Sequence, residues 1–102
     1  MARIVWTEPA ISDLDEIADY IALDDSKAAI GLVRRVFSHV EKLVEHPNLG
    51  SIPKELRSLN AYRQIVEPPC RIFYRKNGNI IYIVHVMRGE RLLRRKNLTR
   101  AS

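Results

Sequence analysis

The sequence predicts one α+β domain spanning residues 1–102, with the element order β-α-α-β-β-β. Two stretches with apolar residues at helical spacing follow one short apolar run near the N-terminus. Three runs rich in β-branched and aromatic residues then lie between residues 61 and 87, separated by Pro68-Pro69 and Asn77-Gly78. We therefore expect a helix hairpin packed on a small, mainly antiparallel sheet, followed by a basic C-terminal tail.

The first strand and first helix are expected to join directly. Residues 2–6 favour a short strand, and Thr7 stands at an N-cap position with Glu8 and Pro9 in the first helical turn. Apolar residues then recur at helical spacing on one face, with acidic residues on the other. The apolar set is Ile11, Leu14, Ile17, Ala18 and Ile21, and the acidic set is Asp13, Asp15, Glu16 and Asp19.

A second helix is expected after Asp24, Asp25 and Ser26, which break and recap the chain. His46-Pro47 ends it, because proline cannot continue a helix. Since the link between the two helices is short, they should form an antiparallel hairpin. The predicted apolar stripe consists of Ala29, Ile30, Val33, Phe37, Val40 and Val44, with Val36 and Leu43 beside it.

The remaining strands are predicted at residues 61–67, 70–76 and 79–87. Asn77-Gly78 favours a two-residue type I′ hairpin turn. The 79–87 run is apolar on both faces, which indicates a central strand.

That turn fixes the expected register. It pairs Arg71 with Val84 and Cys70 with His85. In the absence of a bulge, His85 then shares a face with Cys70, Ile72, Tyr74 and Met87, whereas Arg71 and Arg75 share the opposite face with Phe73 and Tyr82.

Composition argues against several classes of protein. No apolar run approaches the roughly 18 residues of a membrane span, and no signal-type stretch is present. Cys70 is the only cysteine and cannot form an internal disulfide, which fits a reducing cytoplasm. The three histidines show no metal-ligand spacing, and phosphate loops are absent. We expect a cytoplasmic protein without metal, cofactor or membrane partner.

Charge is distributed unevenly along the chain. Residues 1–53 hold five Lys/Arg against nine Asp/Glu, and residues 54–102 hold twelve against three, so the halves carry −4 and +9 and sum to the net +5. A basic half of this density suits an anionic partner, either nucleic acid or an acidic protein segment.

Basic and aromatic residues on the predicted strands are the candidate site residues. Metal-free cleavage of an RNA phosphodiester needs a base for the 2′-OH, cations for the developing phosphorane and an acid for the leaving oxygen. Guanidinium groups suit the second task, and a histidine such as His85 is the residue type most often used for proton transfer. Each of these side chains also has a purely structural interpretation, as a packed or polar-face residue. The full set is Arg57, Arg63, Arg71, Tyr74, Arg75, His85, Arg88 and Arg91.

The pattern resembles the RelE/ParE superfamily of bacterial type II toxin–antitoxin toxins, of the plasmid-stabilisation kind. The motifs are V-W-T-x-x-A-x-x-D-L-x-x-I-x-x-Y-I at 5–21, H-P-x-x-G at 46–50, E-L-R at 55–57, Y-R at 62–63, C-R-I-F-Y-R at 70–75 and I-x-I-V-H-V-M-R-x-E-R at 81–91. The resemblance implies the same fold and a small antitoxin that neutralises the toxin. From the basic half we expect the antitoxin to carry an acidic C-terminal segment.

The resemblance implies two targets. RelE-like members cut ribosome-bound mRNA without metal, for which Arg63, Arg71, His85 and Arg88, with Tyr74, would be the catalytic set. ParE-like members poison DNA gyrase, for which Arg57, Arg75, Arg88 and Arg91 would contact the target. No tyrosine follows Tyr82, which departs from the nuclease pattern and favours the ParE-like interpretation. A nucleic-acid-binding module without toxicity is a third hypothesis.

Overall fold

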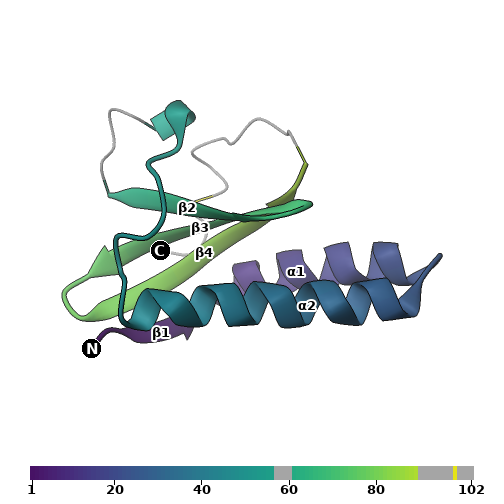
Figure 1. Cartoon of the computed structure of the whole chain (residues 1–102). Coiled ribbons are helices and arrows are strands. Elements are labelled where there is room, and N and C mark those ends of the chain that lie inside the picture. The colour runs from purple at the N-terminus through teal and green to yellow at the C-terminus, as the bar shows by residue number, and fades with distance from the viewer. Residues whose placement is uncertain (57–60, 90–97, 99–102) are drawn as a thin grey trace.

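The computed structural model describes residues 1–56, 61–89 and 98. Two helices pack on one four-stranded sheet, and the predicted order of elements is confirmed (Figure 1). The elements are β1 (Arg3–Trp6), α1 (Glu8–Ala22), α2 (Ser26–Glu41), β2 (Tyr62–Glu67), β3 (Cys70–Asn77) and β4 (Ile80–Arg88).

Side-chain caps begin both helices. The Oγ1 of Thr7 accepts a hydrogen bond from the Ala10 backbone N–H at 3.4 Å, as predicted, and donates one to the Ile83 carbonyl at 2.7 Å. Asp25 caps α2 by accepting from the Ala28 N–H at 3.0 Å. Thr7 therefore both starts α1 and ties it to the middle of the sheet.

The strand order is β1-β4-β3-β2, with β1 parallel to β4 and the other neighbours antiparallel. β4 is central, as its two apolar faces predicted. Both helices lie on one face of the sheet (Figure 1). The face that the helices do not cover is here called the open face.

The apolar stripe of α2 is rotated from the predicted one. Leu32 and Val36 are fully buried, whereas Ile30 and Phe37 are 53% and 43% exposed. Apolar residues occur on more than one side of this helix, so spacing alone fits two stripes. Packing against the sheet selects the stripe centred on Val36.

The predicted hairpin turn was displaced by one residue. Asn77 pairs with Ile80, so the loop is Gly78-Asn79. Gly78 has φ of +60° and is the only loop residue with positive φ. A type II′ turn needs positive φ only at its first central position, where glycine is preferred.

A β-bulge changes the register again. Tyr74 pairs with Ile83, but Phe73 pairs with His85, so Val84 is the extra residue. The prediction that His85 shares a face with Cys70, Ile72 and Tyr74 was therefore wrong. Its ring stacks on Phe73 instead, with centroids 5.7 Å apart.

The sheet carries apolar clusters on both faces. The larger one lies under the helices and includes Ile72, Tyr74, Ile81 and Ile83. The smaller one, on the open face, consists of Leu56, Phe73, Val84, Met87 and Leu98, with Tyr62 and Tyr82 against it. Of the predicted basic tail, residues 90–97 and 99–102 lie outside the described residues. Leu98 is buried in this cluster.

Candidate functional site

Arg71 and Arg75 lie on the open face, as the alternation along β3 predicted. The guanidinium carbon of Arg71 is 4.9 Å from the centroid of the Phe73 ring, and that of Arg75 is 4.5 Å from the centroid of Tyr82. Cation–π contacts of this length hold both side chains against aromatic rings. Arg71 and His85 contact the same Phe73 ring, so the fold brings these two candidate residues together.

A carboxylate that the sequence analysis did not single out holds Arg71. Its Nη1 and Nη2 donate to Glu55 Oε2 and Oε1 at 3.0 and 2.9 Å, and its Nε donates to Gln64 Oε1 at 2.9 Å. The side chains of Arg71 and Glu55 are only 17% and 11% exposed. This two-pronged arrangement is the strongest geometry for a guanidinium–carboxylate pair.

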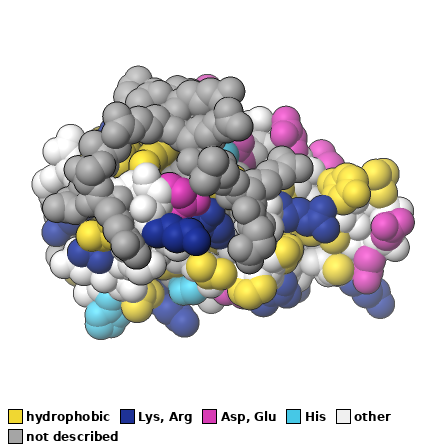
Figure 2. Space-filling view, turned by 90° about the horizontal axis from the view of Figure 1, so that it is seen from above, with side chains coloured by type: hydrophobic (Ala, Val, Ile, Leu, Met, Phe, Trp, Pro, Cys, Tyr) yellow, Lys and Arg dark blue, Asp and Glu magenta, His cyan; other side chains and the backbone are white. Residues whose placement is uncertain are grey.

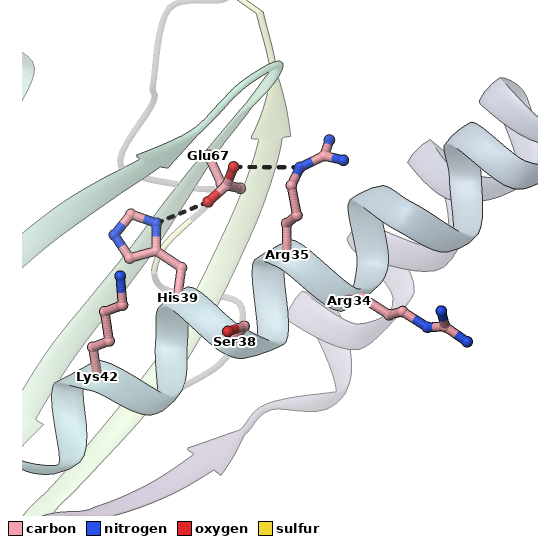
Figure 3. A pocket seen from close by; sticks show the side chains of 6 residues that line it. All are labelled: Arg34, Arg35, Ser38, His39, Lys42 and Glu67. Atoms are coloured by element: carbon pink, nitrogen blue, oxygen red, sulfur yellow. Dashed lines mark hydrogen bonds and ion pairs between the residues drawn. The ribbon is translucent and has the colours of Figure 1, made fainter.

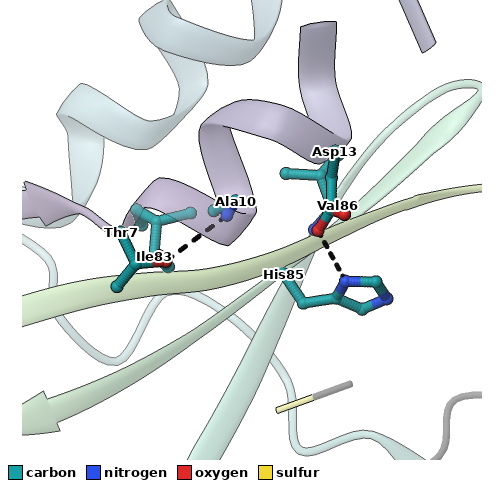
Figure 4. A network of polar contacts seen from close by, with 6 residues as sticks. All are labelled: Thr7, Ala10, Asp13, Ile83, His85 and Val86. Atoms are coloured by element: carbon teal, nitrogen blue, oxygen red, sulfur yellow. Dashed lines mark hydrogen bonds and ion pairs between the residues drawn. The ribbon is translucent and has the colours of Figure 1, made fainter. Parts of the chain in front are cut away.

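His85 is also held by a carboxylate. Its Nδ1 lies 2.7 Å from Asp13 Oδ2, which accepts a second hydrogen bond from the Val86 N–H at 3.1 Å (Figure 4). An ionised carboxylate only accepts, so Nδ1 carries the proton. Asp13 was predicted on the exposed face of its helix, and that prediction was wrong because the side chain reaches from α1 to β4.

Arg63 and Tyr74 lie on the helix-covered face, paired across β2 and β3. Arg63 Nη1 donates to the Gly50 carbonyl at 2.7 Å. Tyr74 Oη accepts from the Gly50 N–H at 2.9 Å and donates to the Pro47 carbonyl at 2.8 Å. Both side chains thus fasten the loop around Gly50 to the sheet, away from Arg71 and His85.

Burial raises the pKa of the Tyr74 hydroxyl above its ordinary value of 10.0. It likewise raises the pKa of the Cys70 thiol above 9.0. A raised pKa suits a hydroxyl that donates a hydrogen bond, and it makes Tyr74 a weak general base near neutral pH.

Because the pKa values of Tyr74 and Cys70 are raised, we expect the protein to lose stability in alkali. The folded chain keeps both protons at pH values where the unfolded chain loses them, so the free energy of unfolding falls as pH rises above about 9, by up to about 1.4 kcal/mol per pH unit for each group. Urea denaturation at neutral and alkaline pH measures this decrease. It should be smaller for Tyr74→Phe, and an equal decrease in that variant would contradict a contribution from Tyr74.

The remaining candidate site residues are not placed beside Arg71 and His85. Arg88 ends β4, with its guanidinium carbon 5.0 Å from the centroid of the exposed Tyr20 ring on α1. Arg57 and Arg91 lie outside the described residues. The predicted set is therefore divided, with Arg71, Arg75 and His85 on the open face, Arg63 and Tyr74 beneath the sheet, and Arg88 at its end.

Within the described part of the chain, no group of three or more His, Cys, Asp or Glu side chains is placed to hold a metal ion. No helix in that part is long and apolar enough to cross a membrane. Several acidic side chains lie at one end of the view in Figure 2, where Lys and Arg side chains are also present.

Sequence reasoning missed Glu55 and Asp13 as members of the site. Glu55 could have been predicted as a site residue. It is one of only three carboxylates in residues 54–102, and a strand arginine packed on an apolar face needs a counter-charge. Asp13 could not have been predicted, since its partner is 72 residues away in the sequence.

Comparisons with a family model and with individual proteins both match this chain to toxins. The model described as ParE toxin of type II toxin-antitoxin system, parDE, matches residues 4–93. The chain is 33% identical over 93 residues to Toxin RelE2 of Caulobacter vibrioides, covering 90% of this chain and all of that protein. It is 37% identical over 87 residues to Putative toxin Y4kP of Sinorhizobium fredii, covering 81% and 86% of the two chains.

A solved structure of the chromosomal ParDE TA system from P. aeruginosa is similar in fold. It superposes with a TM-score of 0.72 at 27% identity, and the match covers 88% of this chain and 98% of that one.

Proposed function

The chain belongs to the ParE toxin family of type II toxin–antitoxin systems, and on that premise we propose that it arrests bacterial growth by poisoning DNA gyrase without chemistry of its own. The observation that carries this proposal is the two-pronged pairing of Arg71 with Glu55. A guanidinium committed to a carboxylate has to leave it before it binds a scissile phosphate.

Two further observations support a mechanism without proton transfer. His85 is 6% exposed and bonded to Asp13, which gives it a structural role between α1 and β4. Tyr74 uses its hydroxyl in two hydrogen bonds that fix a loop. Of the described candidate residues, Arg75 and Arg88 would then contact gyrase or the DNA it holds.

Gyrase poisoning leaves broken DNA, and this gives a test in cells. Induction of the chain should fragment the chromosome, which pulsed-field electrophoresis of intact nucleoids would reveal before growth stops. Growth arrest with an intact chromosome would contradict a gyrase target.

The family also points to a cognate antitoxin, and the similar solved structure is that of a ParDE system. Induction of the chain alone should abolish colony formation, and co-expression of a short neighbouring reading frame should restore it. Normal colony formation on induction of soluble chain would instead favour a nucleic-acid-binding module without toxicity.

A second candidate function is ribosome-dependent cleavage of mRNA without metal. It is favoured by one specific observation, that Arg71 pairs with Glu55 and contacts the same Phe73 ring as His85 on the open face. A carboxylate, a guanidinium and an imidazole could serve as base, phosphate ligand and acid.

The double variant Glu55→Gln with Arg71→Gln separates the two candidates. It removes both charges together, so neither partner is left as an unpaired buried ion. The variant is therefore expected to keep the fold and, under the gyrase proposal, full toxicity. Under the nuclease alternative, toxicity and new cuts in translated messages, read by primer extension, should both disappear. The comparison is made at equal levels of soluble protein.

A further inference from the structure

A basic groove lies between α2 and β2, on the helix-covered side of the sheet. It encloses about 310 Å³, and all of its described lining residues are charged or polar (Figure 3). They are Arg34, Arg35, Ser38, His39, Lys42 and Glu67. None of them belongs to the pairs around Arg71 and His85.

The cations of the groove continue a basic line along α2. Lys27 stands seven residues before Arg34, which is nearly two full helical turns, so both side chains leave the same side of the helix. Lys42 follows directly after the helix and completes the line. Four of the five Lys/Arg residues at positions 1–53 therefore lie on this side of α2, although these positions carry a net charge of −4. The average charge of that half does not predict such a surface.

Most of the positive charge in the groove has no internal counter-charge. Glu67 is the only described lining carboxylate and lies 3.4 Å from Arg35 Nε and 3.2 Å from His39 Nδ1 (Figure 3). Arg34 and Lys42 make no ion pair within the described residues. Three Lys/Arg against one carboxylate leave the groove at +2 with His39 neutral, so it attracts anions.

The chemistry of the lining selects among anions. Guanidinium, ammonium and hydroxyl groups are the donors that proteins use for phosphate oxygens. The His39 imidazole is the only ring among the described lining residues, whereas single-stranded nucleic acids are bound through stacking on several aromatic rings. None of these lining residues is apolar, whereas a protein partner needs buried aromatic or aliphatic anchors. These properties favour the phosphate backbone of a duplex.

We propose that this side of α2 binds the sugar–phosphate backbone of duplex DNA, with Arg34 and Lys42 on different phosphates. Eight residues separate these two side chains, about 12 Å along a helix axis, whereas phosphates of one strand recur about every 3.4 Å along the duplex. Such contacts position a protein on DNA without reading its sequence. That the DNA is the segment held by gyrase rests on the proposed function, whereas the binding itself does not.

Fluorescence anisotropy with a short labelled DNA duplex, titrated at several salt concentrations, tests the groove directly. The double variant Arg34→Gln with Lys42→Gln should bind about tenfold more weakly. Its plot of log affinity against log salt should be shallower by about two, since each lost phosphate contact removes about 0.9 from the slope. Duplexes of unrelated sequence should bind equally well. Unmodified chain that does not bind the duplex would overturn the proposal.

The double variant Arg3→Gln with Lys76→Gln is the matched control. Both double variants lower the net charge by two, from +5 to +3, but Arg3 and Lys76 do not line the groove. The control should keep most of the affinity and most of the salt dependence. If it loses as much of both as the groove variant does, binding follows the overall charge of the chain, and the groove is not the site.

Glu67→Gln tests the groove through a gain of binding, which a damaged fold would not produce. The amide keeps an oxygen that can accept from Arg35 and His39, and the only described lining carboxylate loses its charge. Affinity for the duplex should rise about threefold, because a phosphate no longer meets a like charge. Unchanged or weaker binding by this variant would contradict phosphate contacts in the groove.

A glutamate homopeptide distinguishes DNA from an acidic protein segment. Duplex DNA carries one negative charge per about 1.7 Å, whereas an extended glutamate chain carries one per about 3.3 Å. The peptide should therefore compete for the groove at least about tenfold more weakly, at equal concentration of negative charge. Peptide that displaces the duplex at equal charge would overturn the assignment to DNA.

A gyrase assay tests which DNA is bound. The groove variant should need about tenfold more chain than the Arg3→Gln with Lys76→Gln control to accumulate cleaved plasmid. Equal potency of the two variants would contradict contact with the DNA that gyrase holds. If the unmodified chain leaves gyrase undisturbed, the proposed function fails, whereas the anisotropy measurements still decide whether the groove binds DNA.

Discussion

Gly50→Ala is expected to lower the free energy of unfolding by about 3 kcal/mol, as overpacking and disturbed hydrogen bonds combine. A Cβ at this position would lie 2.4 Å from the Gln64 carbonyl oxygen and 2.8 Å from both Cε1 and Oη of Tyr74. The side chain of Tyr74 is 1% exposed and has no room to retreat. The close approach of three chain segments, rather than an unusual φ, therefore requires glycine here.

The same change disturbs three hydrogen bonds. Gly50 N–H donates to Tyr74 Oη, Tyr74 Oη donates to the Pro47 carbonyl, and Arg63 donates to the Gly50 carbonyl. Moving the loop by the distance that a methyl group needs lengthens all of them. The melting temperature should fall by roughly 12 to 24 °C, given about 4–8 °C per kcal/mol in a domain of this size.

Gly31→Ala is the matched control for thermal and urea unfolding. A Cβ at Gly31 meets only Arg35 Nη1, at an ordinary 3.5 Å, and the position lies inside α2. Alanine should therefore stabilise the chain by about 0.5–1 kcal/mol through its higher helix propensity. If both alanine variants unfold at the same temperature, the network around Gly50 does not hold the loop.

Asp13→Ala is expected to cost about 3 kcal/mol of stability, because it removes the acceptor of two buried donors. β1 pairs with β4 only as far as Ile83. The Val86 N–H therefore has no strand partner on that side and depends on Asp13 Oδ2, which also accepts from His85 Nδ1. One carboxylate thus completes the edge of β4 and fixes the imidazole ring.

Two variants check that interpretation by urea denaturation. Asp13→Asn keeps a carbonyl oxygen for the Val86 N–H and should recover about half of the loss. Asp15→Ala, on the exposed face of α1, should change stability by no more than about 0.5 kcal/mol. Equal effects of Asp13→Ala and Asp15→Ala would show that Asp13 contributes nothing to the link between α1 and β4.

Local signals predicted the elements of the fold well. The caps at Thr7 and Asp25 depend on residues that are close in the sequence, so both could be predicted. The second helix was predicted to run as far as His46, whereas α2 ends at Glu41 and is followed by a 3-10 helix over Lys42–Val44. The central place of β4 followed from its two apolar faces. These features gave the order of the elements and the helix hairpin.

Features set by tertiary packing could not be predicted in the same way. Spacing fits two stripes on α2, and only the sheet beneath decides that Leu32 faces inward. The bulge at Val84 changes which residues face Phe73, and nothing in the 79–87 run marks it. The partners of Arg71 and His85 come from distant segments, so the sequence predicted the cations of the site but not the carboxylates that hold them.

Under the proposed function, the pairing of Arg71 with Glu55 and of His85 with Asp13 makes these two basic residues stabilising rather than catalytic. A nuclease site needs Arg71 available to phosphate and His85 available for proton transfer. Here Glu55 and Asp13 occupy hydrogen-bonding groups of both side chains. On this account, the open face carries a stabilising network, and the surface cations act through binding.

The most direct test of this account is gyrase supercoiling in vitro with the purified chain. Relaxed plasmid, ATP and bacterial gyrase are incubated with micromolar chain, and ribosomes translating a defined message receive the same preparation in parallel. The account predicts loss of supercoiling with accumulation of cleaved plasmid, while the message stays intact. Undisturbed supercoiling together with new cuts in the translated message would contradict it.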